Sequence, residues 1–117
     1  MLPPLSATLS ALQAFGQKLG ITAGNIANVN TDGYKKSQAL LEEGPHGEVE
    51  VREQRIDTPG LPLDLPESGG HAVRESSNVA LEEEIPALIT TVYGFKANLK
   101  AVQAQDEMLG QLLNTVA

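Results

Sequence analysis

The sequence predicts a mainly α-helical protein in which two long terminal helices pair antiparallel, in the manner of a coiled coil. Near both ends of the 117-residue chain, apolar residues recur at alternating spacings of four and three residues. Between these segments, proline, glycine and charged residues are frequent, and the helical spacing is lost. We therefore expect a helix, an extended irregular middle segment with a small β-hairpin, and a second helix.

The N-terminal segment, residues 1–35, is predicted to hold one helix followed by an asparagine- and glycine-rich turn. A leucine or isoleucine occurs every seven residues from Leu5 to Ile26, which predicts a helix to about Asn28. Glycines at four-residue spacing form a second stripe, which indicates either close approach of another helix or a weak, frayed helix. These glycines are Gly16, Gly20 and Gly24.

The middle segment, residues 36–77, is predicted to be exposed and variable. Its first part, "SQALLEEGPHGEVEVREQRI", has alternating polar and apolar residues around a glycine-rich turn, which predicts a β-hairpin that turns at residues 44–47. The following stretch contains three prolines and the pair Gly69 and Gly70. It predicts an extended linker with little regular structure.

The C-terminal segment, residues 78–117, has the strongest helical pattern. The spacing of four and three residues continues over about five heptads, which predicts a coiled-coil helix. The residues of this apolar seam are Leu81, Ile85, Leu88, Val92, Phe95, Leu99, Val102, Asp106, Leu109, Leu113 and Val116.

The start of this second helix carries two further signals. Ser77 and Asn78 are candidate N-caps, and the glutamates at 82–84 suit the positive end of the helix dipole. Pro86 lies inside the apolar pattern and removes one backbone hydrogen bond, so we expect a bend or a restart of the helix near Glu84.

Composition excludes several function classes. The formal charge is −7, and the eight basic residues form no cluster, so nucleic acid is not expected as a partner. Cysteine is absent, and the two histidines lie in glycine-rich loops without a nucleophile motif, so we expect no enzyme, metal, cofactor or small-molecule substrate. No apolar run is long enough for direct membrane insertion, and the N-terminus lacks the pattern of a cleaved signal peptide.

The two apolar stripes need to be buried, and the terminal helices are the only segments long enough to serve each other. A two-helix hairpin still leaves each helix partly uncovered, so we expect lateral packing against other subunits to complete the burial. Asn30 and Asp106 at seam positions fit this expectation, because polar seam residues fix register and partner at some loss of stability.

The stretch "NIANVNTDGYKKSQ", which begins at Asn25, resembles the N-terminal signature of the bacterial flagellar rod and hook axial proteins. The C-terminal stretches "SNVALEEEIPALI" and "YGFKANLKAVQAQDEMLGQLL" resemble the same family, in the right order and at the right end. Pro86, Gly94 and the short middle segment depart from the family pattern. The short middle resembles the small proximal rod proteins most, whereas the tail "DEMLGQLLN" also resembles the distal rod and hook members.

This resemblance implies a structural subunit of the flagellar basal-body rod, which polymerises through its terminal helices into the torque-transmitting axial tube. It implies other rod or hook subunits and further copies of the chain as partners, and a place in the periplasmic rod after export without a cleaved signal peptide. The alternative is a free-standing coiled-coil oligomer or an export chaperone with the same pattern, which would form a closed oligomer.

The two matching ends supply the candidate assembly residues. Gly33 is expected to adopt a positive φ, and the neighbouring asparagine and threonine side chains to satisfy backbone groups at the helix end. The full set is Asn25, Ile26, Asn28, Asn30, Thr31, Gly33, Tyr34, Asn78, Leu88, Val92, Phe95, Asn98, Leu99, Val102, Asp106, Met108 and Leu109.

Overall fold

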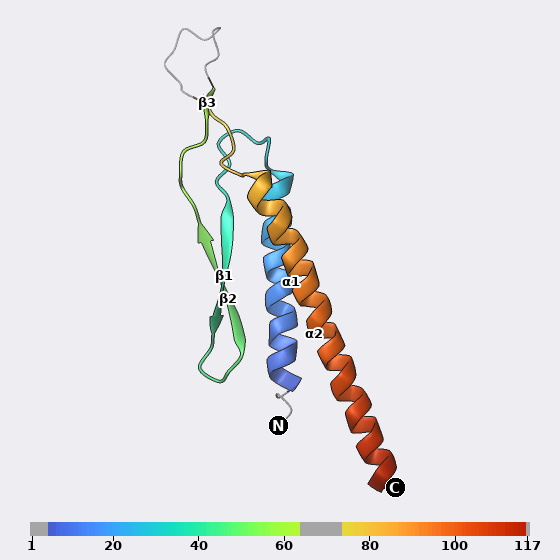
Figure 1. The fold of residues 1–117 in the computed structure, drawn as a ribbon. Helices are drawn as coiled ribbons and strands as arrows, with labels where there is room; N and C mark the ends of the chain where they lie inside the picture. The colour runs from blue at the N-terminus through green and yellow to red at the C-terminus, as the bar shows by residue number, and fades with distance from the viewer. Residues whose placement is uncertain (1–4, 64–73, 117) are drawn as a thin grey trace.

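The computed structural model describes residues 5–63 and 74–116, which form two long helices and two small antiparallel strand pairs. The first helix lies between the hairpin and the second helix, and the helices run antiparallel (Figure 1). The molecule is elongated, with extents of 82 × 26 × 16 Å. The predicted fold class is confirmed. In chain order the elements are α1 (Leu5–Ala27), β1 (Ser37–Glu43), β2 (Val49–Arg55), β3 (Pro62–Leu63), β4 (Arg74–Glu75) and α2 (Leu81–Val116).

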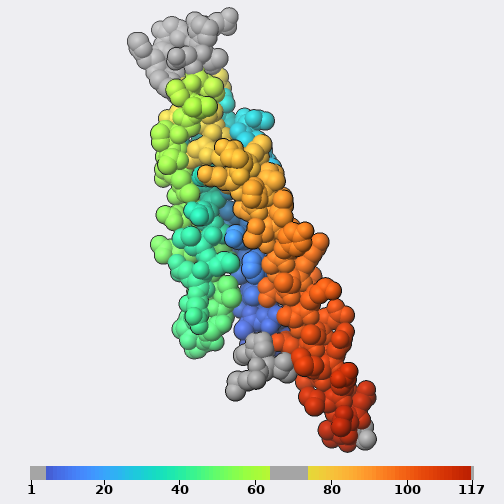
Figure 2. Space-filling model, viewed as in Figure 1, coloured from blue at the N-terminus to red at the C-terminus, as the bar shows by residue number. Residues whose placement is uncertain are grey.

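The helix α1 is covered from two directions, by the hairpin on one side and by α2 on the other. In the space-filling view, α1 is visible as a narrow strip between these two elements (Figure 2). Ala14 faces the hairpin and is 2% exposed, and the Ser10 hydroxyl accepts a hydrogen bond of 3.1 Å from the Val49 N–H. The hairpin therefore gains support from α1, which a two-stranded sheet needs in water.

The two helices meet through polar and small residues rather than through leucines. Thr8 and Thr22 on α1 are buried, and Thr91 on α2 is 0% exposed. The Phe15 ring packs against Gly94, where an added Cβ would lie 2.8 Å from the ring. Among the described residues, the only buried hydrophobic side chains are Ala14 and Val79, so the core is very small.

The expectation that the two apolar stripes bury each other is wrong. On α2 the deeply placed residues follow their own seven-residue spacing, at Glu84, Thr91, Asn98 and Gln105, with Asn98 half-buried and the others buried. Each lies one position before a residue of the predicted seam, which is a rotation of about 100° around the helix. The seam itself is left at the edge of the helix pair or outside it.

The helix α2 begins at Leu81 and is continuous through Pro86, so the predicted restart near Glu84 is wrong. Pro86 lies in the second turn and removes one intrahelical bond, while buried residues on both sides of it hold the helix in place. The predicted N-caps are also wrong. The Ala80 carbonyl accepts hydrogen bonds from the N–H groups of Glu83 and Glu84, at 3.0 and 3.1 Å, which places Ala80 at the N-cap.

The predicted hairpin is present, with Leu41 opposite Val51 and a turn in which Gly47 has a φ of 80°. A second, two-residue pair was not expected: β3 and β4 join the ends of the linker, with Pro62 opposite Glu75. The predicted linker glycines, Gly69 and Gly70, lie outside the described residues.

Candidate assembly surface and the junction that positions it

Asn25, in the last turn of α1, is the centre of a buried junction between four chain segments. Its side chain is 2% exposed. The amide nitrogen donates to the Ser37 carbonyl (2.7 Å) and to Glu84 Oε2 (3.3 Å). The amide oxygen accepts from the Ser37 N–H (3.1 Å) and from the Tyr34 hydroxyl (3.3 Å). All four hydrogen-bonding positions of the amide are thereby used, and α1, β1 and α2 are fixed to one another.

Asn78, just before α2, forms a second junction beside the first. Its side-chain oxygen accepts from the Lys36 N–H (2.7 Å), and its amide nitrogen donates to the carbonyls of Ile56 (2.8 Å) and Thr58 (3.0 Å). The backbone N–H of Asn78 donates to the Tyr34 carbonyl at 3.3 Å. The side chain thus bridges the start of β1 and the end of β2, in the way a neighbouring strand would.

The turn after α1 is closed by the residues that the sequence indicated. Asn28 donates from its side chain to the Gly24 carbonyl at 2.8 Å, and the Thr31 hydroxyl donates to the Asn28 side-chain oxygen at 3.1 Å. Gly33 has a φ of 72°, and its N–H donates to the Glu75 carbonyl at 2.8 Å. Gly33 has the expected positive φ and Asn28 the expected bond to a backbone carbonyl, whereas Thr31 bonds a side chain and Asn30 makes no side-chain hydrogen bond among the described residues.

Ion pairs surround the same junction. Lys35 pairs with Glu75 and Lys36 pairs with Glu83, both at 2.9 Å. The lysine side chains are mostly covered and the two glutamates are partly solvent-exposed, so each pair contributes little free energy by itself. Together with the asparagines they fix the angle at which the chain leaves α1 and enters α2.

The apolar stripes of the two helices lie on one side of the pair. On α1, Leu12 lies three residues before Phe15 of the interface. At 100° per residue this is −300°, which places Leu12 about +60° around the helix from Phe15. On α2, Ile85 follows Glu84 of the interface by one residue, a rotation of about 100° in the same sense. In an antiparallel pair, equal senses of rotation point to the same side, and the hairpin covers the opposite one. We call this surface the apolar side; its residues are Leu5, Leu9, Leu12, Leu19, Ile26, Leu81, Ile85, Leu88, Val92, Phe95, Leu99, Val102 and Leu109.

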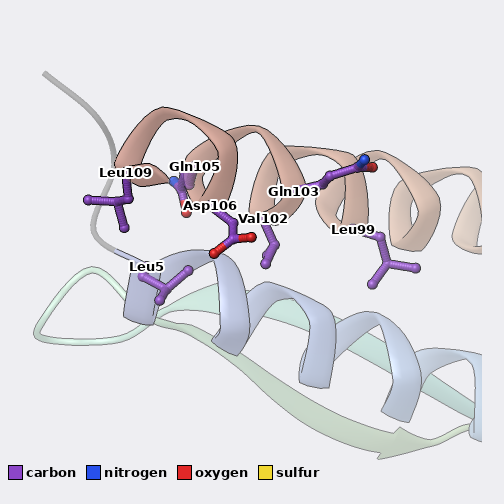
Figure 3. Close-up of a pocket in the computed structure, with 7 residues that line it drawn as sticks. All are labelled: Leu5, Leu99, Val102, Gln103, Gln105, Asp106 and Leu109. Atoms are coloured by element: carbon purple, nitrogen blue, oxygen red, sulfur yellow. The ribbon is translucent and has the colours of Figure 1, made fainter. Parts of the chain in front are cut away.

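A groove of about 410 Å³ on the apolar side shows the two stripes together (Figure 3). Leu5 from α1 lies at the same end of the groove as Leu109, and Val102 and Leu99 follow along α2 toward the other end. Leu5 is 48% exposed and Leu99 is 46% exposed. Among the described residues none fills this groove, whose lining also includes Gln103, Gln105 and Asp106.

The C-terminal end of α2 extends past α1. Every residue in the range 106–116 is exposed, including Leu113 at 71% and Val116 at 85%. At 1.5 Å per residue this stretch spans about 16 Å of helix. Such a helix end has an apolar stripe without any described partner within the chain.

The candidate residues fall in two parts of the structure: the region around the junction, and the helix α2. Asn25, Tyr34 and Asn78 meet at the junction, whereas Asn30 is exposed and Ile26 is half-buried. On α2 the half-buried members are Leu88, Val92, Phe95, Asn98 and Val102, and the exposed members are Leu99, Asp106, Met108 and Leu109.

Several residues of these contacts were not among the candidates, and Ser37, Glu84, Phe15 and Gly94 are examples. Glu84 carried only the signal of an acidic helix start, and its bond to Asn25 spans 59 positions of sequence. Gly94 was marked as a departure from the family pattern, but nothing in the sequence paired it with Phe15. Long-range contacts of this kind leave no local pattern.

The described residues contain no candidate metal site and no candidate membrane-spanning helix. Within residues 5–63 and 74–116, no group of three or more histidine, aspartate or glutamate side chains could hold a metal ion. Neither described helix is long and apolar enough to cross a membrane.

Comparison with protein families identifies both ends of the chain. The family described as "Flagella basal body rod protein" matches residues 5–35, and the family described as "Flagellar basal body rod FlgEFG protein C-terminal" matches residues 72–115. No curated protein matches the chain. The matches cover α1 with its turn and α2 with its start, more than half of the chain. The chain therefore belongs to the flagellar basal-body rod protein family and is a structural component of the flagellum.

Proposed function

We propose that this chain is a rod subunit that polymerises through its terminal helices into the torque-transmitting axial tube, without enzymatic activity. The observation that carries the proposal is the placement of the apolar stripes. The helices contact each other through the Phe15 ring and through polar and small residues, and they leave most of their leucines on one shared side. A chain that folded for itself alone would bury those residues, because each fully buried leucine or isoleucine contributes about 1.5–3 kcal/mol.

The size of the core supports the same reading. Only Ala14 and Val79 are buried hydrophobic residues among those described, and a small core supplies about 3–5 kcal/mol at best. Neighbouring subunits on the apolar side would add the missing burial. The exposed seam residues Asn30 and Asp106 would then fix the register between subunits.

The partners we propose are other rod subunits and further copies of this chain, within the periplasmic part of the rod, reached by the flagellar export route. The apolar side of one subunit would pack against a different surface of the next. Contacts of this heterologous kind do not close and generate a helical array. The junction at Asn25 and Asn78 would keep the hairpin at a fixed angle to the helices when the tube transmits torque.

The proposal is tested by substitutions at exposed leucines. Leu9→Gln and Leu99→Gln change residues of the apolar side that are 46% exposed, and Leu61→Gln changes a leucine that is 75% exposed and belongs to neither helix. An epitope tag in the exposed hairpin turn at residues 45–46 reports incorporation into purified basal bodies.

We expect the two apolar-side variants to lose at least tenfold in rod incorporation and in swimming, and Leu61→Gln to match the unsubstituted protein. Circular dichroism checks that all variants remain folded. If the tagged unsubstituted chain is found only in the soluble fraction while the tagged cells still swim, the proposal is wrong. That outcome would favour the free oligomer or chaperone.

A further inference from the structure

A second exposed patch lies on α2, on a face turned away from α1. Ile85, Ile89 and Tyr93 follow at four-residue spacing and are 41%, 51% and 68% exposed. Glu82 precedes and Lys96 follows them on the same face, and both are exposed. In the described parts of the chain, neither of these two charged residues forms an ion pair.

The residues of this patch are spaced so that two copies of it match when one copy runs antiparallel to the other. Glu82 and Lys96 are each seven residues from Ile89, and Ile85 and Tyr93 are each four residues from it. If a second α2 lies antiparallel against this face with Ile89 on the two-fold axis, Glu82 meets Lys96 of the second copy twice, and Ile85 meets Tyr93 of the second copy twice. In this contact each charged residue thus faces a residue of opposite charge, and Ile85 and Ile89 face Tyr93 and Ile89 of the second copy.

We propose that this patch is a two-fold contact through which two copies of the chain form an antiparallel dimer in solution. Charge complementarity selects a second copy as the occupant, because the acidic end of the patch matches its own basic end only in the antiparallel orientation. Five residues per copy make a contact well below the roughly 1,200 Å² of a stable interface, so the dimer is weak and exchanges readily.

The dimer has a consequence for assembly, and this step rests on the proposed function. Ile85 belongs to both the patch and the apolar side, so the dimer covers part of the surface that packs in the rod. Subunits of a polar tube all point the same way along the axis, whereas the two chains of this dimer point in opposite ways. The dimer would therefore compete with the growing rod for Ile85 and lower the share of soluble chain that is free to assemble.

Charge reversal tests the contact in the purified full-length chain. Glu82→Lys and Lys96→Glu each turn two attractive pairs into two repulsive pairs, and the double variant restores attraction. By sedimentation equilibrium in low salt, we expect each single variant to weaken dimerisation about tenfold and the double variant to recover the original value. A double variant no better than the singles, or an unsubstituted chain that stays monomeric at millimolar concentration, would overturn the proposal.

Cysteine cross-linking tests the two-fold axis directly, since the natural chain contains no cysteine. A cysteine at position 89 would lie against itself in the dimer, so Ile89→Cys is expected to form a disulfide-linked dimer under mild oxidation. Thr90→Cys is the matched control, because position 90 is exposed but is turned about 100° away. Equal cross-linking at both positions would contradict the contact.

These tests are independent of the rod assignment. Loss of rod incorporation in the Leu99→Gln variant with a monomeric soluble chain would leave the proposed function standing and remove the dimer. A cross-linked dimer from a chain absent from basal bodies would leave the dimer standing and remove the proposed function.

Discussion

Replacement of Asn25 by alanine is the most informative single change in the junction. The side chain makes four hydrogen bonds at 2.7–3.3 Å and is 2% exposed. Asn25→Ala removes all four and leaves the N–H and carbonyl of Ser37, the Tyr34 hydroxyl and the Glu84 carboxylate without this partner. No other position in the described chain links α1, β1 and α2 through one side chain.

The size of the effect follows from the bond lengths. The two bonds to Ser37, at 2.7 and 3.1 Å, should each contribute about 1 kcal/mol to the free energy of unfolding. The two longer bonds, at 3.3 Å, should each contribute about half as much. Ser37 is half-buried, so water can replace only part of what is lost. We therefore expect a decrease of about 2–4 kcal/mol in the free energy of unfolding. This is most of the roughly 3–5 kcal/mol that a core of this size supplies.

Urea unfolding followed by circular dichroism measures this change. With a slope of about 1.5–2 kcal/mol per molar urea, the midpoint should fall by about 1–3 M, or the helices should already be partly lost in buffer. Asn30→Ala is the matched control, because Asn30 lies at the same helix end, is exposed, and makes no hydrogen bond among the described residues. Equal midpoints for the two variants, within the error of the measurement, would refute the role assigned to Asn25.

The remaining predictions concern the soluble chain and use the same unfolding assay. Gly94→Leu should lower stability by about 1–3 kcal/mol, because the new side chain meets the Phe15 ring. Gly16→Ala should raise stability by about 0.5–1 kcal/mol, since nothing lies within 4 Å of the added Cβ. A decrease in stability would mean that another group packs against Gly16. Gly33→Ala should lower stability by about 1–2 kcal/mol, because φ is 72°. Asn78→Ala should lower it by about 2–3 kcal/mol through its lost backbone bonds, and a loss below 0.5 kcal/mol would contradict the bridge.

The helices, the hairpin and the turn at Gly33 could be predicted because their signals are local. Seven-residue apolar spacing predicts a helix whatever it packs against, and alternation around a glycine-rich turn predicts two paired strands. The division into residues 1–35, 36–77 and 78–117 rests on the same local signals and stays a prediction. The glycine turn was predictable because a positive φ favours glycine there.

The choice of buried face could not be predicted, because it depends on contacts far apart in sequence. The apolar stripes suggested that leucines meet leucines, whereas Asn25 with Glu84 and Phe15 with Gly94 fix a different pair of faces. A seven-residue repeat also drifts by about 20° per heptad on a straight helix, so its relation to a neighbour changes along the helix.

Asn78 is a second residue whose role depends on contacts far apart in sequence. As a residue just before a helix it matched the composition of an N-cap, a local role. Its partners in the fold are Lys36, Ile56 and Thr58, at separations of 20 to 42 residues. Residue statistics near a helix start contain no information about such partners, so the cap was the natural but wrong interpretation.

In the assembled rod, we expect neighbouring subunits to cover the apolar side. Single cysteines in this cysteine-free chain test it most directly: Leu99→Cys on the apolar side and Glu53→Cys on the exposed part of the hairpin. Alkylation by a water-soluble maleimide is compared between the soluble chain and purified basal bodies. The account predicts that position 99 reacts in the soluble chain and is protected at least tenfold in basal bodies, while position 53 reacts in both. Equal reactivity of position 99 in the two states would contradict it.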